Sequence, residues 1–183
     1  MKVKDTHVLD RAANSVLSAV TTGVQTYGTK SVTTVGHSLG AAISLLDAIY
    51  LPLHISGLTV TFYGYGLPRV RIETRMSNRE AWKSNVSFAQ VGNQAFANYV
   101  DSQLNGRFTR ITNLKDPVPI LPGQFLGFKH PSGEDHIDTG EVWKLCPGQE
   151  NPSTQCSDGA VPNIFVGDIG NHDGPYNGIT MGC

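Results

Sequence analysis

The sequence predicts an α/β fold, with a central, mostly parallel sheet flanked by helices. Short β-branched or apolar segments alternate along the chain with longer segments of helical period, as in α/β proteins. Glycine- and proline-rich stretches separate these segments, and no internal repeat or linker interrupts them. The chain has 183 residues, 39% of them hydrophobic, which is enough for one domain with a sizeable core. We therefore expect residues 1–183 to form a single domain.

The individual elements follow from the spacing of apolar residues and from turn signals. Apolar residues recur every three or four positions from Thr6 to Tyr27, which predicts an amphipathic helix that ends at Gly28. The β-branched segment Ser31–Val35 predicts a strand. The apolar run Ala41–Tyr50 predicts a helix that ends at Pro52. Three further strands are expected at Leu58–Tyr63, Phe108–Asn113 and Glu141–Leu145.

Composition and charge exclude several classes of partner. Lys and Arg number 14, Asp and Glu 15, and the basic residues are scattered, so we expect no nucleic-acid partner. The longest apolar stretch, Ala41–Leu53, is interrupted by Asp47 and is shorter than the roughly 18 residues of a transmembrane segment. No residue spacing resembles a zinc site or a phosphate-binding glycine loop, so we expect no metal and no cofactor. Nothing in the sequence implies a protein partner.

The cysteines and the N-terminus give opposite indications about the cellular compartment. Cys146 and Cys156 flank a loop rich in Pro, Gly, Ser and Asn, which predicts a short disulfide-closed loop of an exported protein. This pairing leaves Cys183 without a partner. The opening residues Met1–Asp5 lack the apolar stretch of a signal peptide, so we expect no export signal in this chain. Three free thiols in a cytosolic protein are the alternative.

The segment Gly36–Gly40 matches the pattern G-x-S-x-G, the turn that presents a nucleophilic serine in α/β-hydrolases. Its context is the required one, because a β-branched strand precedes it and an apolar helix follows it. In this sharp, strained turn we expect a side chain at either flanking glycine to collide with neighbouring elements. Ser38 is therefore the predicted nucleophile and the Leu39 N–H a predicted oxyanion donor. A chance Gly-Ser-Gly turn is the alternative.

A serine nucleophile needs a histidine base and an acid that orients the histidine. In α/β-hydrolases the acid follows the serine and the histidine follows the acid. The acid candidates are Asp116, Glu134, Asp135 and Asp138. Asp116 is preferred because it follows a predicted strand and begins a proline-stiffened loop at the sheet edge where α/β active sites form. An ordinary turn aspartate is the alternative.

Six histidines compete for the role of base. Three are poor candidates. His7 and His54 do not fit the required chain order, and His37 lies inside the nucleophile turn and faces the scaffold. The loop just after Asp116 holds His130 and His136, whereas His172 lies far downstream in a loop able to return to the strand ends. We predict His172 as the base, with His130 as the competitor.

Several ordered motifs together resemble the fungal class 3 lipases, secreted triacylglycerol lipases and feruloyl esterases of the α/β-hydrolase type. The motifs are Val35–Gly40, Val60–Gly64 leading to Gly66–Val70, Asp116–Pro122, and the late His172. The resemblance covers most of the chain. It implies that Ser38, Asp116 and His172 form a triad, that His130 belongs to a structural stretch, and that Cys146 and Cys156 form the family's small disulfide. It also implies that the full-length parent is extracellular.

The chain departs from the family pattern first at its N-terminus. It begins where the family's helix before the nucleophile strand begins, so we expect a truncated domain. Such a domain lacks the N-terminal strands, the lid, the second oxyanion donor and the cysteine that would pair with Cys183. The Ser31–Val35 strand then becomes an exposed edge prone to pair with other chains. Since one missing oxyanion donor costs about 10²–10³ in rate, a complete triad does not by itself make this chain active.

The second departure is an inserted segment, residues 70–90, at a place where the family runs without interruption. Codons for Val70-Arg71, Ser84-Asn85 and Gln90 can carry splice donor, branch-point and acceptor signals. We therefore interpret residues 70–90 as a retained intron translated in frame. A tolerated surface insertion is the alternative. The glycosylation sequon Asn85-Val86-Ser87 lies inside this segment, and we do not expect it to be functional.

The predicted function is hydrolysis of a carboxylic ester through an acyl-enzyme on Ser38, as by a triacylglycerol lipase in lipid catabolism. The expected partner is an ester or lipid substrate met at an oil–water interface. A feruloyl or carbohydrate esterase on the same scaffold is the first alternative. A peptidase with the same triad and a non-catalytic truncated gene product are the others.

Overall fold

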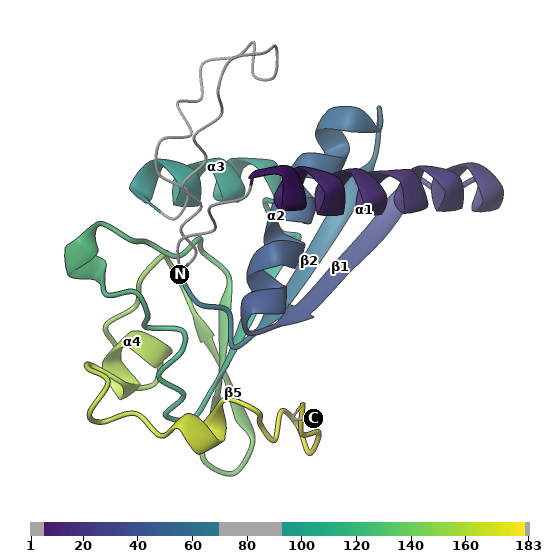
Figure 1. Ribbon diagram of the computed structural model, residues 1–183. Helices are drawn as coiled ribbons and strands as arrows, with labels where there is room; N and C mark the ends of the chain where they lie inside the picture. The colour runs from purple at the N-terminus through teal and green to yellow at the C-terminus, as the bar shows by residue number, and fades with distance from the viewer. Residues whose placement is uncertain (1–5, 70–92, 182–183) are drawn as a thin grey trace.

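The computed structural model describes residues 6–69 and 93–181, with side chains from residue 12 onward (Figure 1). The predicted insertion at 70–90, its sequon and Cys183 lie outside the described residues. The elements in chain order begin with helix α1 (Thr6–Tyr27), strand β1 (Ser31–His37), helix α2 (Leu39–His54) and strand β2 (Thr59–Tyr65). They continue with α3 (Gln94–Gln103), β3 (Phe108–Asn113), the 3₁₀ turn η1 (Gln124–Leu126), β4 (Glu134–Asp138), β5 (Val142–Cys146), α4 (Ser157–Ala160) and the 3₁₀ turn η2 (Ile169–Asn171).

The described strands form one sheet in the order β1-β2-β3-β4-β5. Strands β1 to β4 pair in parallel, and β5 pairs antiparallel to β4. The predicted α/β class with a mostly parallel sheet is therefore confirmed. In the described part of the chain β1 pairs only with β2, and the side chain of Val35 on β1 is 57% exposed.

The main core lies between the sheet and helices α1 to α3. Figure 1 shows α1 and α2 on the same side of β1 and β2. Buried side chains of α2, β2 and α3, such as Leu45, Phe62 and Val100, form one apolar cluster, and the apolar stripe of α1 packs against it. A smaller cluster, Ile111, Ile137 and Tyr176, lies under the carboxyl ends of β3 and β4. Among the described helices none is long and apolar enough to cross a membrane.

The structure differs from the predicted elements most clearly at helix α2 and strand β4. Helix α2 does not end at Pro52 but continues to His54, because a proline removes one backbone donor without preventing the following residues from completing the turn. Strand β4 was not predicted, because its sequence Glu-Asp-His-Ile-Asp is mostly ionisable. It is nevertheless buried at Glu134 and His136, whose side chains have polar partners.

Candidate active site

Ser38 occupies the turn between β1 and α2 in a strained backbone conformation. Its φ is 55° and its ψ is −127°, outside the regions that residues with a Cβ favour. The turn is held by a hydrogen bond from the Ser38 N–H to the Tyr65 carbonyl at 2.9 Å. A Cβ at Gly36 would lie 2.5 Å from the Gly40 carbonyl carbon, so this position requires glycine. The same expectation for Gly40 is wrong, because a Cβ there would meet no atom within 4 Å.

Three residues that the sequence singled out lie in one hydrogen-bonded chain. The His172 Nε2 lies 2.7 Å from the Ser38 Oγ, and the His172 Nδ1 lies 2.9 Å from the Asp116 Oδ2. Asp116 is 1% exposed, and its Oδ1 accepts a hydrogen bond from the Val118 N–H at 2.8 Å. A carboxylate accepts the Nδ1 proton, which leaves Nε2 free to take the serine proton. The order hydroxyl, imidazole, carboxylate is the one that activates a serine.

The backbone of His172 is itself held from two sides. The His37 Nε2 donates to the His172 carbonyl at 2.8 Å, and the Tyr176 hydroxyl donates to the same oxygen at 2.9 Å. Burial, followed by the negative charges of Asp116 and Asp173, raises the pKa of Tyr176, so its hydroxyl stays protonated and donates.

Three residues of this site were not identified by the sequence reasoning. It placed His37 as facing the scaffold, but the His37 ring centroid lies 4.6 Å from that of His172. Gly66 has a φ of +55°, and a Cβ on it would lie 2.8 Å from the His172 Cε1. Tyr176 was missed because only the fold brings it to His172. The sole sequence signal for Gly66 was its place in the Gly66–Val70 motif.

The competing acids and histidines lie elsewhere. Glu134, Asp135 and Asp138 lie on β4, where Glu134 accepts hydrogen bonds from Arg110 at 2.9 Å and Thr112 at 2.8 Å. His136 also lies on β4 rather than in a loop, and its Nδ1 is 2.8 Å from the Thr112 Oγ1.

His130, the competing candidate for the base, is buried, with 1% of the residue exposed. Its Nε2 donates to the Pro119 carbonyl at 2.8 Å. Burial and the nearby Arg110 charge lower the pKa of His130 to about 3, so this ring is neutral. This ring contact with a loop carbonyl group gives His130 a structural role.

The structure contains the predicted disulfide between Cys146 and Cys156. It closes the loop between β5 and α4. Within the described ranges, no group of three or more His, Cys, Asp or Glu side chains is arranged to hold a metal ion.

With this geometry in hand, comparison with known proteins places the chain in a family. Residues 5–126 match the family described as lipase (class 3). A secreted mono- and diacylglycerol lipase of Malassezia globosa is 35% identical over 151 residues, which are 79% of this chain and 43% of that protein. Lipase II from Rhizopus niveus has a similar structure, with a TM-score of 0.72 and 27% identity over 96% of this chain and 57% of that one.

A second solved structure is that of a triacylglycerol lipase whose catalytic centre is a serine protease triad. Its TM-score is 0.71 with 29% identity, and the match covers 94% of this chain and 57% of that one. The chain thus spans about half the length of the relatives it matches. The motif resemblance and the matched residues agree, and the chain belongs to the class 3 lipase family.

Proposed function

We propose that this chain carries the catalytic residues of a carboxylic-ester hydrolase that acts on acylglycerols. The observation that carries the proposal is the continuous hydrogen-bonded chain from the Ser38 Oγ through His172 to Asp116. Family membership supports it, because relatives in this family are mono-, di- and triacylglycerol lipases. The catalytic centre of the triacylglycerol lipase of similar structure is a serine protease triad, an arrangement generally made of Ser, His and Asp.

The chemistry would proceed in two halves. The Ser38 Oγ attacks the ester carbonyl carbon as its proton moves to the His172 Nε2, and the Leu39 N–H donates to the oxyanion of the tetrahedral intermediate. The C–O bond to the alcohol then breaks, and His172 returns the proton to the leaving alcohol. A water molecule attacks the acyl-enzyme by the same route and releases the carboxylic acid. Asp116 stabilises the imidazolium in both halves.

The surroundings of the triad suit an apolar acyl group. Leu39, next to the nucleophile, is 60% exposed. Further exposed apolar side chains lie in the two loops that carry Asp116 and His172: Leu121, Phe125, Leu126, Ile164, Phe165, Val166 and Ile169. These loops lie together, because the Asp168 N–H donates to the Lys115 carbonyl at 2.8 Å. Exposed apolar side chains beside the nucleophile and on the loops that carry its two partners favour a lipid substrate over a polar sugar ester.

Export of the parent protein is part of the same proposal. The disulfide is typical of an oxidising compartment, and the relative from Malassezia globosa is a secreted lipase.

The test is hydrolysis of short- and long-chain p-nitrophenyl esters by the purified chain and by its Ser38→Ala variant. We expect activity in the parent chain and a loss of about 10⁴-fold or more in the variant, since removal of a triad serine leaves only binding and oxyanion contributions. Ser44→Ala is the matched control, because Ser44 lies on α2 and its hydroxyl donates to the Val35 carbonyl rather than to a triad residue. Equal activity in Ser38→Ala and the parent chain would refute the proposal.

A further inference from the structure

A buried ionic cluster lies behind the loop that carries Asp116. The loop runs from Asp116 to Pro122 and contains three prolines. Within the described ranges, two residues donate hydrogen bonds to the carbonyl groups of residues 119–122. The His130 Nε2 donates to Pro119 at 2.8 Å. The Arg69 backbone N–H donates to Leu121 at 2.8 Å, and its Nη1 donates to Ile120 and, at 3.2 Å, to Pro122.

Arg69 is 3% exposed, and every nitrogen of its guanidinium has a partner. Its Nε and Nη2 donate to the two oxygens of Glu150 at 3.0 and 2.7 Å, and Nη2 also pairs with Asp158. A bidentate arginine–carboxylate pair fixes both the position and the plane of the guanidinium. The remaining nitrogen, Nη1, is thereby aimed at the Asp116 loop.

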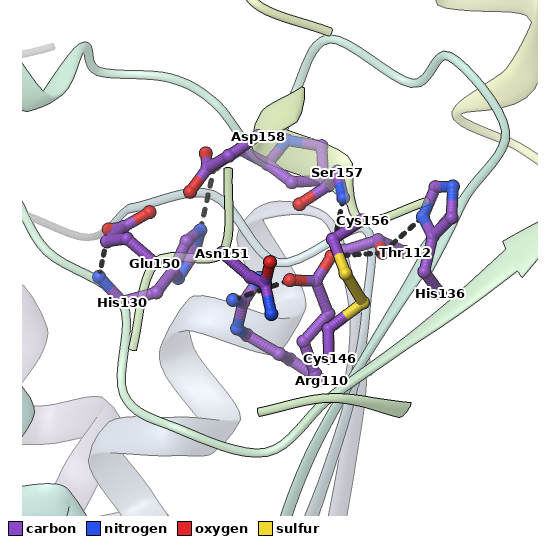
Figure 2. Close-up of polar contacts among 12 residues, drawn as sticks. Arg110, Thr112, His130, His136, Cys146, Glu150, Asn151, Cys156, Ser157 and Asp158 are labelled. Atoms are coloured by element: carbon purple, nitrogen blue, oxygen red, sulfur yellow. Dashed lines mark hydrogen bonds and ion pairs between the residues drawn. A yellow bond between two sulfur atoms is a disulfide. The ribbon is translucent and has the colours of Figure 1, made fainter. Parts of the chain in front are cut away.

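The carboxylates of this cluster come from the disulfide-closed region. Glu150 lies between Cys146 and Cys156, and Asp158 lies two residues beyond Cys156. Figure 2 shows Glu150 turned toward His130, whose backbone N–H donates to it at 2.6 Å. Although burial opposes its ionisation, hydrogen bonds with Asp158 and Arg69 lower the pKa of Glu150 to about 2, so it is charged at neutral pH.

We propose that Arg69 is a positioning residue for the triad: anchored by Glu150 and Asp158, it holds the carbonyl groups behind Asp116 and so keeps that carboxylate on His172. This inference rests on the proposed function, because it assigns Asp116 to the triad. The three prolines of the loop limit its backbone freedom, so a shift at Ile120 to Pro122 is carried toward Asp116 rather than absorbed locally. A misplacement of about 1 Å at a catalytic group costs about 10²-fold in rate.

The test compares the full chain with its Arg69→Lys variant. Lysine keeps the positive charge, but its single ammonium group cannot bind both oxygens of Glu150 and reach the Ile120 carbonyl at the same time. We expect kcat for p-nitrophenyl esters to fall about 10- to 100-fold, with KM nearly unchanged. We also expect the low-field NMR resonance of the proton between the His172 Nδ1 and Asp116 to shift or disappear. A purely structural role would lower the melting temperature without moving this resonance in the folded protein.

Arg107→Lys is the matched control. Arg107 also donates to backbone carbonyl groups, those of Val60 at 3.1 Å and Gln103 at 2.6 Å, but it lies before β3 at the other end of the sheet. We expect this variant to keep the kcat and the resonance of the parent chain. An equal fall of kcat in both variants would overturn the proposal.

A second variant decides the question if Arg69→Lys does not fold. Glu150→Gln keeps the size of the side chain but removes its charge and one of its two acceptors for Arg69, so we expect a smaller shift of the resonance and a smaller fall in kcat.

The resonance does not depend on turnover, so the two proposals fail separately. If the parent chain hydrolyses no ester but its resonance responds to Arg69→Lys, the proposed function fails for this chain and the positioning role stands. A parent chain without the resonance, or a folded variant with unchanged resonance and kcat, overturns the positioning role.

Discussion

Gly66→Ala is the most informative single substitution at the site. The added Cβ would lie 2.8 Å from the His172 Cε1, 2.9 Å from its Nδ1 and 3.0 Å from the Tyr176 hydroxyl. Carbon atoms pack at about 3.5 Å or more, so the His172 ring must retreat by about 0.7 Å. A shift of that size lengthens the 2.7 Å contact to the Ser38 Oγ beyond about 3.2 Å, the outer limit of a good hydrogen bond. We expect kcat for ester hydrolysis to fall about 10- to 100-fold.

A second glycine variant separates the effect of backbone strain from the effect of the collision with His172. Gly66 has a φ of +55°, where alanine costs roughly 1–2 kcal/mol in unfolding free energy. Gly106 has a φ of +70° with no atom within 4 Å of its Cβ position, so Gly106→Ala carries the strain without the collision. Urea unfolding and p-nitrophenyl ester kinetics on both variants give the comparison. Equal kcat values in Gly66→Ala and Gly106→Ala would show that the contact between residue 66 and His172 does not control catalysis.

Three further predictions concern the surroundings of the triad. Reduction of the Cys146–Cys156 disulfide, which closes a loop with a sequence separation of 10, should lower the free energy of unfolding by roughly 3 kcal/mol in urea titrations. Tyr176→Phe removes one of two donors to the His172 carbonyl and should lower kcat/KM by about 2- to 10-fold, since one hydrogen bond contributes roughly 0.5–1.5 kcal/mol. Burial, together with Glu150, raises the pKa of Asp158 to about 7, so Asp158→Asn should gain stability relative to the parent chain as pH rises from 5 to 8.

The linkage between protonation of Asp158 and folding determines how stability changes with pH. The folded state binds the Asp158 proton more tightly than the unfolded state, whose pKa is near the ordinary 3.8. The stability it contributes is complete below about pH 3.8 and is lost as pH rises through about 7. Asparagine does not titrate, so the difference in unfolding free energy should grow by about 1 kcal/mol or more over this range. A difference that is constant with pH would contradict the assigned shift.

Unchanged unfolding after reduction would contradict the role given to the disulfide. Unchanged kcat/KM in Tyr176→Phe would show that His37 alone holds the His172 carbonyl.

The part of the fold that local sequence determines could be predicted. The β-branched Ser31–Val35, the glycine-flanked Ser38 and the apolar run after it specify a strand, a turn and a helix within one stretch of chain, and the structure has all three. Strand β3 was predicted at its observed bounds, Phe108–Asn113. Strand β4 was not, because the buried partners that make its ionisable side chains acceptable come from β3 and the disulfide region.

The candidate site likewise has residues that the sequence could predict and residues that it could not. Chain order and motif context indicated Ser38, Asp116 and His172, and the structure brings these three together, although their catalytic role stays a prediction. The contacts of Gly66 and Tyr176 with His172, and those of Arg69 with Glu150, join segments distant in the chain. No local pattern in a single sequence marks such pairs.

Covalent modification by diethyl p-nitrophenyl phosphate would show directly whether Ser38 is an activated nucleophile. The Ser38 Oγ would displace p-nitrophenolate from phosphorus. We therefore expect about one p-nitrophenolate released per folded chain and a diethylphosphoryl group on Ser38 in the peptide mass spectrum. A His172→Gln variant should react at least about 10³-fold more slowly, since it lacks the base. Modification at another residue, or equal rates in the parent chain and the His172→Gln variant, would show that Ser38 is not activated by His172.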